Sequence, residues 1–195
     1  MRTAGVDEVG RGALFGPVVA AAVILPAAAI APLSAAGVTD SKKLSPLKRQ
    51  RLARQIRQVA LYAVGMASVY EIDRINILQA SLLAMRRAIN QLSPPPDLCL
   101  VDGNQRIPEL LLAQRTVVKG DQRELAIAAA SIIAKVWRDE LIVRLAQRYP
   151  GYDLASNKGY GSAKHRAGIA TYGICRQHRR SFRSCQRSPE IARTS

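Results

Sequence analysis

The sequence of 195 residues has few cysteines and few histidines, and both scarcities limit the kinds of site that it can build. The three cysteines, Cys99, Cys175 and Cys185, have no metal-ligand spacing and cannot all pair with one another, so we expect reduced thiols. Two histidines, His165 and His178, are too few for a His-rich zinc site, and we assign them to phosphate contacts or to structure.

Long hydrophobic runs are also lacking, which argues against a membrane protein. The longest apolar stretch, residues 17–32, is interrupted by Pro26 and is shorter than the ~20 residues that a bilayer requires. Asp7, Glu8 and Arg11 precede this stretch, an order that a secretory signal does not have. We therefore expect a cytoplasmic protein with no membrane partner.

Acidic residues are scarce relative to basic ones. The chain has 29 Lys plus Arg against 14 Asp plus Glu, a formal net charge of +15, and most of the positive charge is arginine, whose planar fork suits phosphate. A polyanion is the expected partner, and nucleic acid is the commonest one. Hydrophobic residues still make up 48% of the sequence, which is enough for one folded domain with a core and too much for a disordered chain.

Strand-like and helix-like patterns alternate along the chain, which predicts an α/β domain with a mixed central sheet flanked by helices. We expect strands at residues 3–6, 17–25, 62–70, 98–101 and 115–119. Helices are expected at residues 45–59, 71–92, 123–149 and 162–172. The Ala/Pro-rich residues 26–37 are expected to form an irregular connection, and residues 183–195 a flexible tail.

Four carboxylates follow predicted strands of this sheet. Asp7 and Glu8 come after the first strand, Asp102 after the fourth and Asp121 after the fifth, and ligands of open α/β sheets bind at these carboxyl ends. Carboxylates held together repel one another unless a cation neutralises them, and Mg²⁺ favours oxygen ligands. Two such ions about 4 Å apart can activate water and stabilise the leaving oxygen in phosphodiester cleavage. Taken one at a time, each acid also fits ordinary turn chemistry.

Seven short segments, two of them in two parts, carry a family resemblance. They are, in order, residues 5–12 and 16–21 (GVDEVGRG and GPVVAA), 40–44 (DSKKL), 101–104 (VDGN), 119–121 (KGD), 128–136 and 138–139 (AAASIIAKV and RD), 158–161 (KGYG) and 178–182 (HRRSF). In these segments the chain resembles type 2 ribonuclease H, also called ribonuclease HII. The segments span residues 5–182, and their common order makes the resemblance specific.

The resemblance implies an RNase H-like fold with a small helical C-terminal extension, in which residues 1–182 form the catalytic domain together with a substrate-binding segment. It implies an endonuclease that hydrolyses the RNA strand of RNA–DNA hybrids. The same enzyme would incise duplex DNA 5′ to single ribonucleotides and leave 3′-hydroxyl and 5′-phosphate ends. The implied cofactor is Mg²⁺ or Mn²⁺, two ions in the catalytic complex, and we expect a monomer.

The resemblance also assigns residues to roles. The family's metal-binding catalytic acids correspond to Asp7, Glu8, Asp102 and Asp121, and its substrate contacts to Gly10, Arg11, Gly12 and Tyr160. Glycine lets a backbone approach a sugar closely, and telling RNA from DNA requires a contact to the 2′-hydroxyl. The Tyr160 ring would lie against the deoxyribose on the 3′ side of the ribonucleotide. We expect Lys42, Lys43 and Lys158 to contact phosphates, although a solvated charge run fits them equally well.

Two other functions remain open. Another metal nuclease of the same superfamily, such as a junction resolvase or a transposase-like enzyme, would cleave all-DNA junctions without requiring ribose. A nucleic-acid-binding protein without enzymatic activity would use the acids only to cap turns. Ser131 and Lys135 lie one helical turn apart, but the apolar residues 128–134 favour a core helix over a nucleophile pair. The spacing of Gly10, Gly12 and Gly16 does not match the dinucleotide-binding fingerprint.

Overall fold

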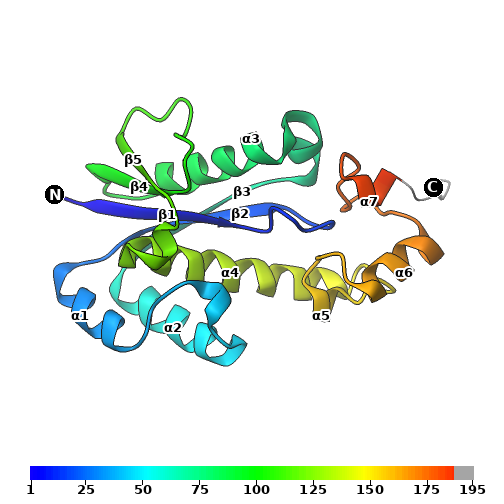
Figure 1. The fold of residues 1–195 in the computed structure, drawn as a ribbon, viewed down its shortest axis with the longest axis horizontal. Coiled ribbons are helices and arrows are strands. Elements are labelled where there is room, and N and C mark those ends of the chain that lie inside the picture. The colour runs from blue at the N-terminus through cyan, green and yellow to red at the C-terminus, as the bar shows by residue number, and fades with distance from the viewer. Residues whose placement is uncertain (187–195) are drawn as a thin grey trace.

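The computed structural model describes residues 1–186 and contains a five-stranded mixed sheet with helices on both faces (Figure 1). The strands are β1 (Thr3–Val9), β2 (Val18–Ile24), β3 (Leu61–Ala67), β4 (Leu98–Asp102) and β5 (Ala113–Val117). Their order in the sheet is β3-β2-β1-β4-β5. β2 is antiparallel to β1 and β3, whereas β1, β4 and β5 are parallel. The prediction of an α/β domain with a mixed sheet is confirmed.

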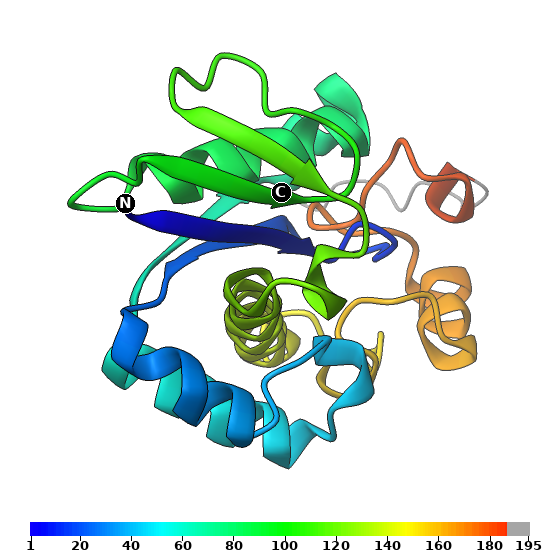
Figure 2. The same ribbon diagram turned by 60° about the vertical axis from the view of Figure 1, so that its left-hand side comes forward.

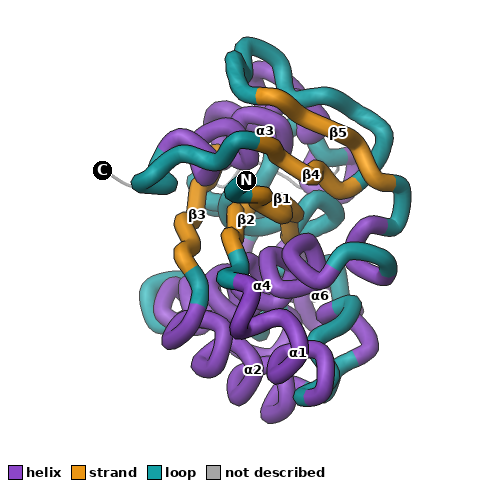
Figure 3. Tube along the Cα trace, turned by 90° about the vertical axis from the view of Figure 1, so that its left-hand side faces the viewer, coloured by secondary structure: helices purple, strands orange, loops and turns teal. Residues whose placement is uncertain are grey.

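Helices cover both faces of this sheet, and further helices lie beyond one end of it (Figures 1 and 2). They are α1 (Ala27–Ala35), α2 (Pro46–Val59), α3 (Val69–Asn90), α4 (Leu125–Ala146), α5 (Leu154–Asn157), α6 (Ala163–Tyr172) and α7 (Arg183–Gln186), with 3₁₀ turns η1 (Ser41–Lys43) and η2 (Gly120–Gln122). α3 covers one face of the sheet and α4 the other, and α1 and α2 lie on the far side of α4 (Figure 3). In the described part of the chain, no helix combines the length and hydrophobicity that a bilayer crossing requires.

The alternation of side chains along β1 divides its residues between the two helical layers. Ala4 and Val6 are fully buried in the core cluster on the α3 side. Gly5 faces α4 so closely that a Cβ atom there would lie 2.1 Å from the carbonyl carbon of Ala126. Glycine at this position therefore lets α4 pack directly on the central strand. Because side chains alternate, Asp7 points to the α4 side and Glu8 to the α3 side.

Helix starts follow from local capping chemistry. The Ser45 hydroxyl accepts a hydrogen bond from the backbone N–H of Lys48, and Pro46 occupies the first turn of α2, as the sequence predicts. α3 begins two residues earlier than predicted because Ser68 and Glu71 form a reciprocal capping box. The predicted strand at residues 62–70 consequently ends at Ala67.

Two predictions at loops and ends were wrong. Residues 26–37, expected to be irregular, contain α1, which buries Ala29 and Leu33; the high helix propensity of alanine outweighs the internal Pro32. Residues 183–186, expected to belong to a flexible tail, form α7, and Cys185 is 1% exposed. The remainder of that predicted tail, residues 187–195, lies outside the described residues.

Candidate active site

Parallel pairing places two of the predicted acids side by side. Val6 of β1 is paired with Val101 of β4, so the next residues, Asp7 and Asp102, are neighbours at the carboxyl ends of the two strands. Asp7 and Glu8 lie within β1, which extends to Val9, and do not follow the strand as the sequence suggested. The backbone N–H of Glu8 donates to Oδ1 of Asp7 at 2.7 Å.

Asp102 is joined to the loop that carries Asp121. Its Oδ1 accepts a hydrogen bond of 2.7 Å from the backbone N–H of Gly120. Asp121 is the next residue, in η2, and its carboxylate is close enough to that of Asp102 for the two negative charges to interact. The prediction that Asp121 directly follows the fifth strand was inexact, because β5 ends at Val117.

Glu8 joins the group from the other side of the sheet. It lines a hollow together with Asp102 and with Leu82 and Met85 of α3. Among residues 1–186, no three side chains of His, Cys, Asp and Glu converge so as to hold a metal ion by themselves. An ion here would take some of its ligands from water or substrate, which is how Mg²⁺ is usually bound.

The electrostatics of the group fit a hard cation. Burial raises the pKa of Asp7 well above its ordinary value, and the charges of Glu8 and Asp102 raise it further. Burial also raises the pKa of Glu8, against the opposing effect of Arg11, whose guanidinium donates to Glu8 at 3.3 Å. The pKa of Asp121 is raised by burial and by neighbouring carboxylates. All the candidate metal-ligand atoms are carboxylate oxygens, and a divalent cation would offset the negative charge of these carboxylates.

Asp40 and Ser131 also belong to this site, and the sequence analysis gave neither a role in it. Asp40 is 5% exposed and shares a hydrogen bond with Asp121, while its Oδ1 accepts from the backbone N–H of Lys42 at 2.9 Å. The Ser131 hydroxyl lies 2.9 Å from that of Ser41 and hydrogen-bonds the carboxylate of Asp7. Asp40 could have been proposed from the sequence, because it is the acid of the DSKKL segment. No local sequence pattern indicates that Ser131 lies near the end of a strand.

The loop with Gly10, Arg11 and Gly12 follows β1 directly. Gly10 has φ of +91°, and a Cβ atom there would lie 2.2 Å from Nε of Arg138, so packing and backbone conformation both require glycine. At Gly12 the space around a Cβ position is empty within 4 Å, and φ is not positive. Nothing inside the described protein therefore requires glycine at position 12.

Tyr160 lies beside this loop, because residue 160 forms an isolated β-bridge with Ala13. The ammonium of Lys135 is 5.4 Å, and the guanidinium carbon of Arg138 5.6 Å, from the centroid of the Tyr160 ring. The structure thus brings the two predicted sugar-contacting elements together.

The three predicted phosphate-contacting lysines are divided between two places. Lys42 and Lys43 are exposed in η1, and the charge of Lys42 acts on Asp121. Lys158 lines a groove between α2, α4 and α5 together with Arg49 and Arg144.

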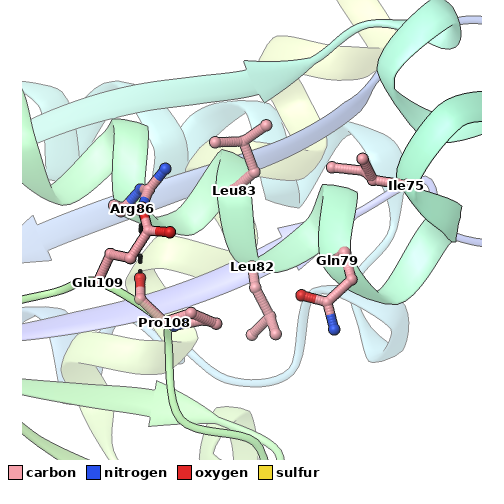
Figure 4. Close-up of a pocket in the computed structure, with 7 residues that line it drawn as sticks. All are labelled: Ile75, Gln79, Leu82, Leu83, Arg86, Pro108 and Glu109. Carbon is pink, nitrogen blue, oxygen red and sulfur yellow. Dashed lines mark hydrogen bonds and ion pairs between the residues drawn. The ribbon is translucent and has the colours of Figure 1, made fainter.

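A further hollow on α3 shares Leu82 with the hollow that Glu8 lines. It is lined by Ile75 and Leu83 and is bordered by an ion pair between Arg86 and Glu109 (Figure 4). None of the four predicted catalytic acids lines it.

Comparisons with known proteins show the family to which the chain belongs. A sequence model of the family described as Ribonuclease HII matches residues 4–185. Ribonuclease HII of Acaryochloris marina (strain MBIC 11017) is 73% identical over 186 residues, covering 95% of this chain and 94% of that protein. Ribonuclease H2 from Pyrococcus horikoshii OT3 has a similar structure, with 29% identity and a TM-score of 0.78, covering 95% of this chain and 96% of that one. The fold is shared with Bst-RNase HIII in complex with Mn²⁺ at 23% identity and a TM-score of 0.77, covering 95% of this chain and 68% of that one. The chain therefore belongs to the ribonuclease HII family of metal-dependent endonucleases, which act on the RNA strand of RNA–DNA hybrids.

Proposed function

We propose that this enzyme also incises duplex DNA 5′ to single ribonucleotides, using two divalent cations held by Asp7, Glu8, Asp102 and Asp121. The observation that carries the proposal is that these acids lie next to the loop of Gly10, Arg11 and Gly12, which follows β1. Asp7 and Asp102 are strand neighbours, and Gly12 lies five residues beyond Asp7 with free space around it. Ions bound at the acids would therefore lie close to a sugar that approaches Gly12.

The donor set supports Mg²⁺ or Mn²⁺ as the cofactor. Asp7 and Asp102, with help from Asp121, would hold one ion, and Asp7 and Glu8 the other. When bound, such ions lower the pKa of an attacking water and stabilise the departing 3′-oxygen. The chain itself contributes the orientation of the carboxylates: Ser131 holds Asp7, and the backbone of Gly120 holds Asp102.

Substrate recognition rests on the two loops that Ala13 and Tyr160 join. The exposed backbone around Gly12 is available to hydrogen-bond a 2′-hydroxyl, since no side chain stands in the way. The Tyr160 ring would contact the deoxyribose on the 3′ side, and Lys42, Lys43 and Lys158 would contact phosphates. A net charge of +15 favours this polyanion and opposes self-association, which supports a monomer.

Cleavage of three labelled duplexes tests the proposal: one with a single ribonucleotide in DNA, one RNA–DNA hybrid and one all-DNA junction, each with Mg²⁺ and with EDTA. We expect Mg²⁺-dependent incision 5′ to the ribonucleotide, with 3′-hydroxyl and 5′-phosphate ends, and no cleavage of the junction. Cleavage of the hybrid alone would refute ribonucleotide incision. Cleavage of the junction would favour a resolvase-like nuclease, and salt-sensitive binding without any cleavage would indicate a binding protein.

A further inference from the structure

Two arginines of the described chain are buried without a carboxylate partner. Arg138 of α4 and Arg179 of the C-terminal segment are each 0% exposed, and neither forms an ion pair within residues 1–186. Burial lowers the pKa of both, and burial together with the charge of Arg138 lowers the pKa of Arg179 to about 9. Two buried cations that repel each other are costly to a fold. Their position therefore points to a role besides stability.

Arg138 binds backbone carbonyls from two separate loops. Its guanidinium donates to the carbonyl oxygens of Phe15 at 2.9 Å and Pro17 at 3.0 Å, both in the β1–β2 connection. A third hydrogen bond of 2.9 Å goes to the carbonyl of Lys158, two residues before Tyr160. Gly10 packs directly on this guanidinium. One side chain thus joins the β1–β2 connection, which carries Gly10 and Gly12, to the loop that carries Lys158 and Tyr160.

Arg179 holds the same connection from the C-terminal side. It donates to the carbonyl oxygens of Arg11 at 2.8 Å and Gly16 at 3.0 Å, and its backbone N–H donates to the carbonyl of Leu14 at 2.9 Å. Its Nη2 is buried and has no hydrogen-bond partner within the described residues. The carbonyl of Arg11, directly before Gly12, is therefore turned inward and fixed.

We propose that Arg138 and Arg179 are positioning residues that set the spacing between the Gly12 backbone and Tyr160, and so determine the preference for a ribonucleotide followed by DNA. The inference rests on the proposed function, because it assumes that these two elements contact the ribose and the next deoxyribose. Neither arginine reaches the substrate, since both are fully buried; each acts through the carbonyls that it holds.

Substitution by lysine removes the planar fork of donors. Lysine offers one nitrogen in place of the three nitrogens with which Arg138 binds the carbonyls of Phe15, Pro17 and Lys158, so it cannot reproduce those contacts. We expect Arg138→Lys and Arg179→Lys to loosen the spacing while leaving electrostatic attraction of the duplex intact. Arg87→Lys is a matched control, because Arg87 donates to the carbonyl of Met66 and to Glu71 on α3, away from both loops.

The measurement is the ratio of kcat/KM for a single ribonucleotide in DNA to kcat/KM for a uniform RNA–DNA hybrid, taken below each variant's unfolding midpoint. We expect the ratio to fall on the order of 10- to 100-fold in Arg138→Lys and Arg179→Lys, and to stay at the wild-type value in Arg87→Lys. Hydrogen exchange at residues 10–17 and 157–160 should become faster in both variants and stay unchanged in α3.

An unchanged ratio in folded Arg138→Lys and Arg179→Lys would overturn the inference, and so would unfolding of both variants, because the arginines would then be structural. If Arg138→Lys alone fails to fold, Arg179→Lys decides the question. Failure of the wild-type enzyme to incise at single ribonucleotides is a separate result, which would refute the proposed function itself.

Discussion

Gly10 and Gly12 are two positions apart in one loop, but their surroundings differ. Gly10 is constrained by a φ of +91° and by contact with Arg138. Gly12 has neither constraint, so no contact within the described protein accounts for its lack of a side chain. A sugar approaching the backbone is the explanation that we propose.

Gly12→Ala should therefore separate stability from activity. We expect the free energy of unfolding to stay within about 0.5 kcal/mol of wild type, because the new methyl group meets open space. Cleavage at a single ribonucleotide should fall at least about tenfold, because the methyl group blocks the sugar. Gly10→Ala is the contrasting variant and should lose stability. Full activity of Gly12→Ala would refute the proposed ribose contact.

Asp7→Asn tests how far the ionised carboxylate of Asp7 destabilises the fold. A raised folded-state pKa means that ionised Asp7 destabilises the fold; this penalty is absent below the unfolded value near 3.8 and complete above the raised folded value. Asp7→Asn should therefore be more stable than wild type at pH 7, and this difference should vanish in acid. Mg²⁺ should raise the unfolding midpoint of wild type more than that of the variant. Chemical denaturation at several pH values, with and without Mg²⁺, measures both effects.

At the scale of elements, β1 explains what sequence patterns could and could not predict. Apolar periodicity located the five strands and the long helices, and the acids at the carboxyl ends of β1 and β4 were predicted on that basis. Asp7 and Glu8 were predicted together, at the end of the first strand. The two-residue alternation of a strand divides them between the α4 and α3 sides, and only the tertiary structure shows which helix each meets.

The contacts that join distant segments could not be predicted at all. Ser131 was assigned correctly to a core helix, but its hydrogen bond to Asp7 depends on how α4 lies on β1. Likewise, the sequence analysis assigned no role to the arginine in segment RD or to the first arginine in segment HRRSF, and only the structure reveals their burial and carbonyl contacts. Such long-range contacts leave no periodic signal in one sequence.

Helix α7 changes what truncation should do. Cys185 packs with Leu14 and Phe15 in one core cluster, so a chain that ends after Phe182 loses a buried side chain. We expect that truncation to cost about 1–3 kcal/mol of unfolding free energy relative to a chain that ends after Gln186, which keeps every described contact. Thermal unfolding of both chains beside the full-length protein measures this. Equal stability of all three would show that α7 adds nothing to the core.

At the scale of the whole molecule, a strongly basic chain contains a small acidic site. The net charge of +15 attracts phosphates, whereas burial and neighbouring carboxylates raise the pKa of Asp7, a cost that a bound cation would offset. Affinity should therefore depend on salt, whereas cleavage should depend on the divalent ion.

Binding of Asp7→Asn to an RNA–DNA hybrid in EDTA should weaken about 100- to 1,000-fold between 50 and 200 mM salt, the change expected for roughly four to six neutralised phosphates. Fluorescence anisotropy follows binding of the uncleaved complex. As a control, the unfolding midpoint of the protein over the same salt range shows whether salt changes the stability of the fold itself. An affinity that does not respond to salt would contradict a role for the positive surface.

In the proposed mechanism, Asp7 and Asp102 act together on the scissile phosphate through bound divalent ions. The most direct measurement is single-turnover cleavage of duplex DNA with one ribonucleotide by Asp7→Asn and by Asp102→Asn, each checked for folding and for substrate binding. We predict that both bind the duplex and that cleavage falls at least about 1,000-fold at saturating Mg²⁺. Wild-type cleavage rates in both folded variants would contradict this mechanism.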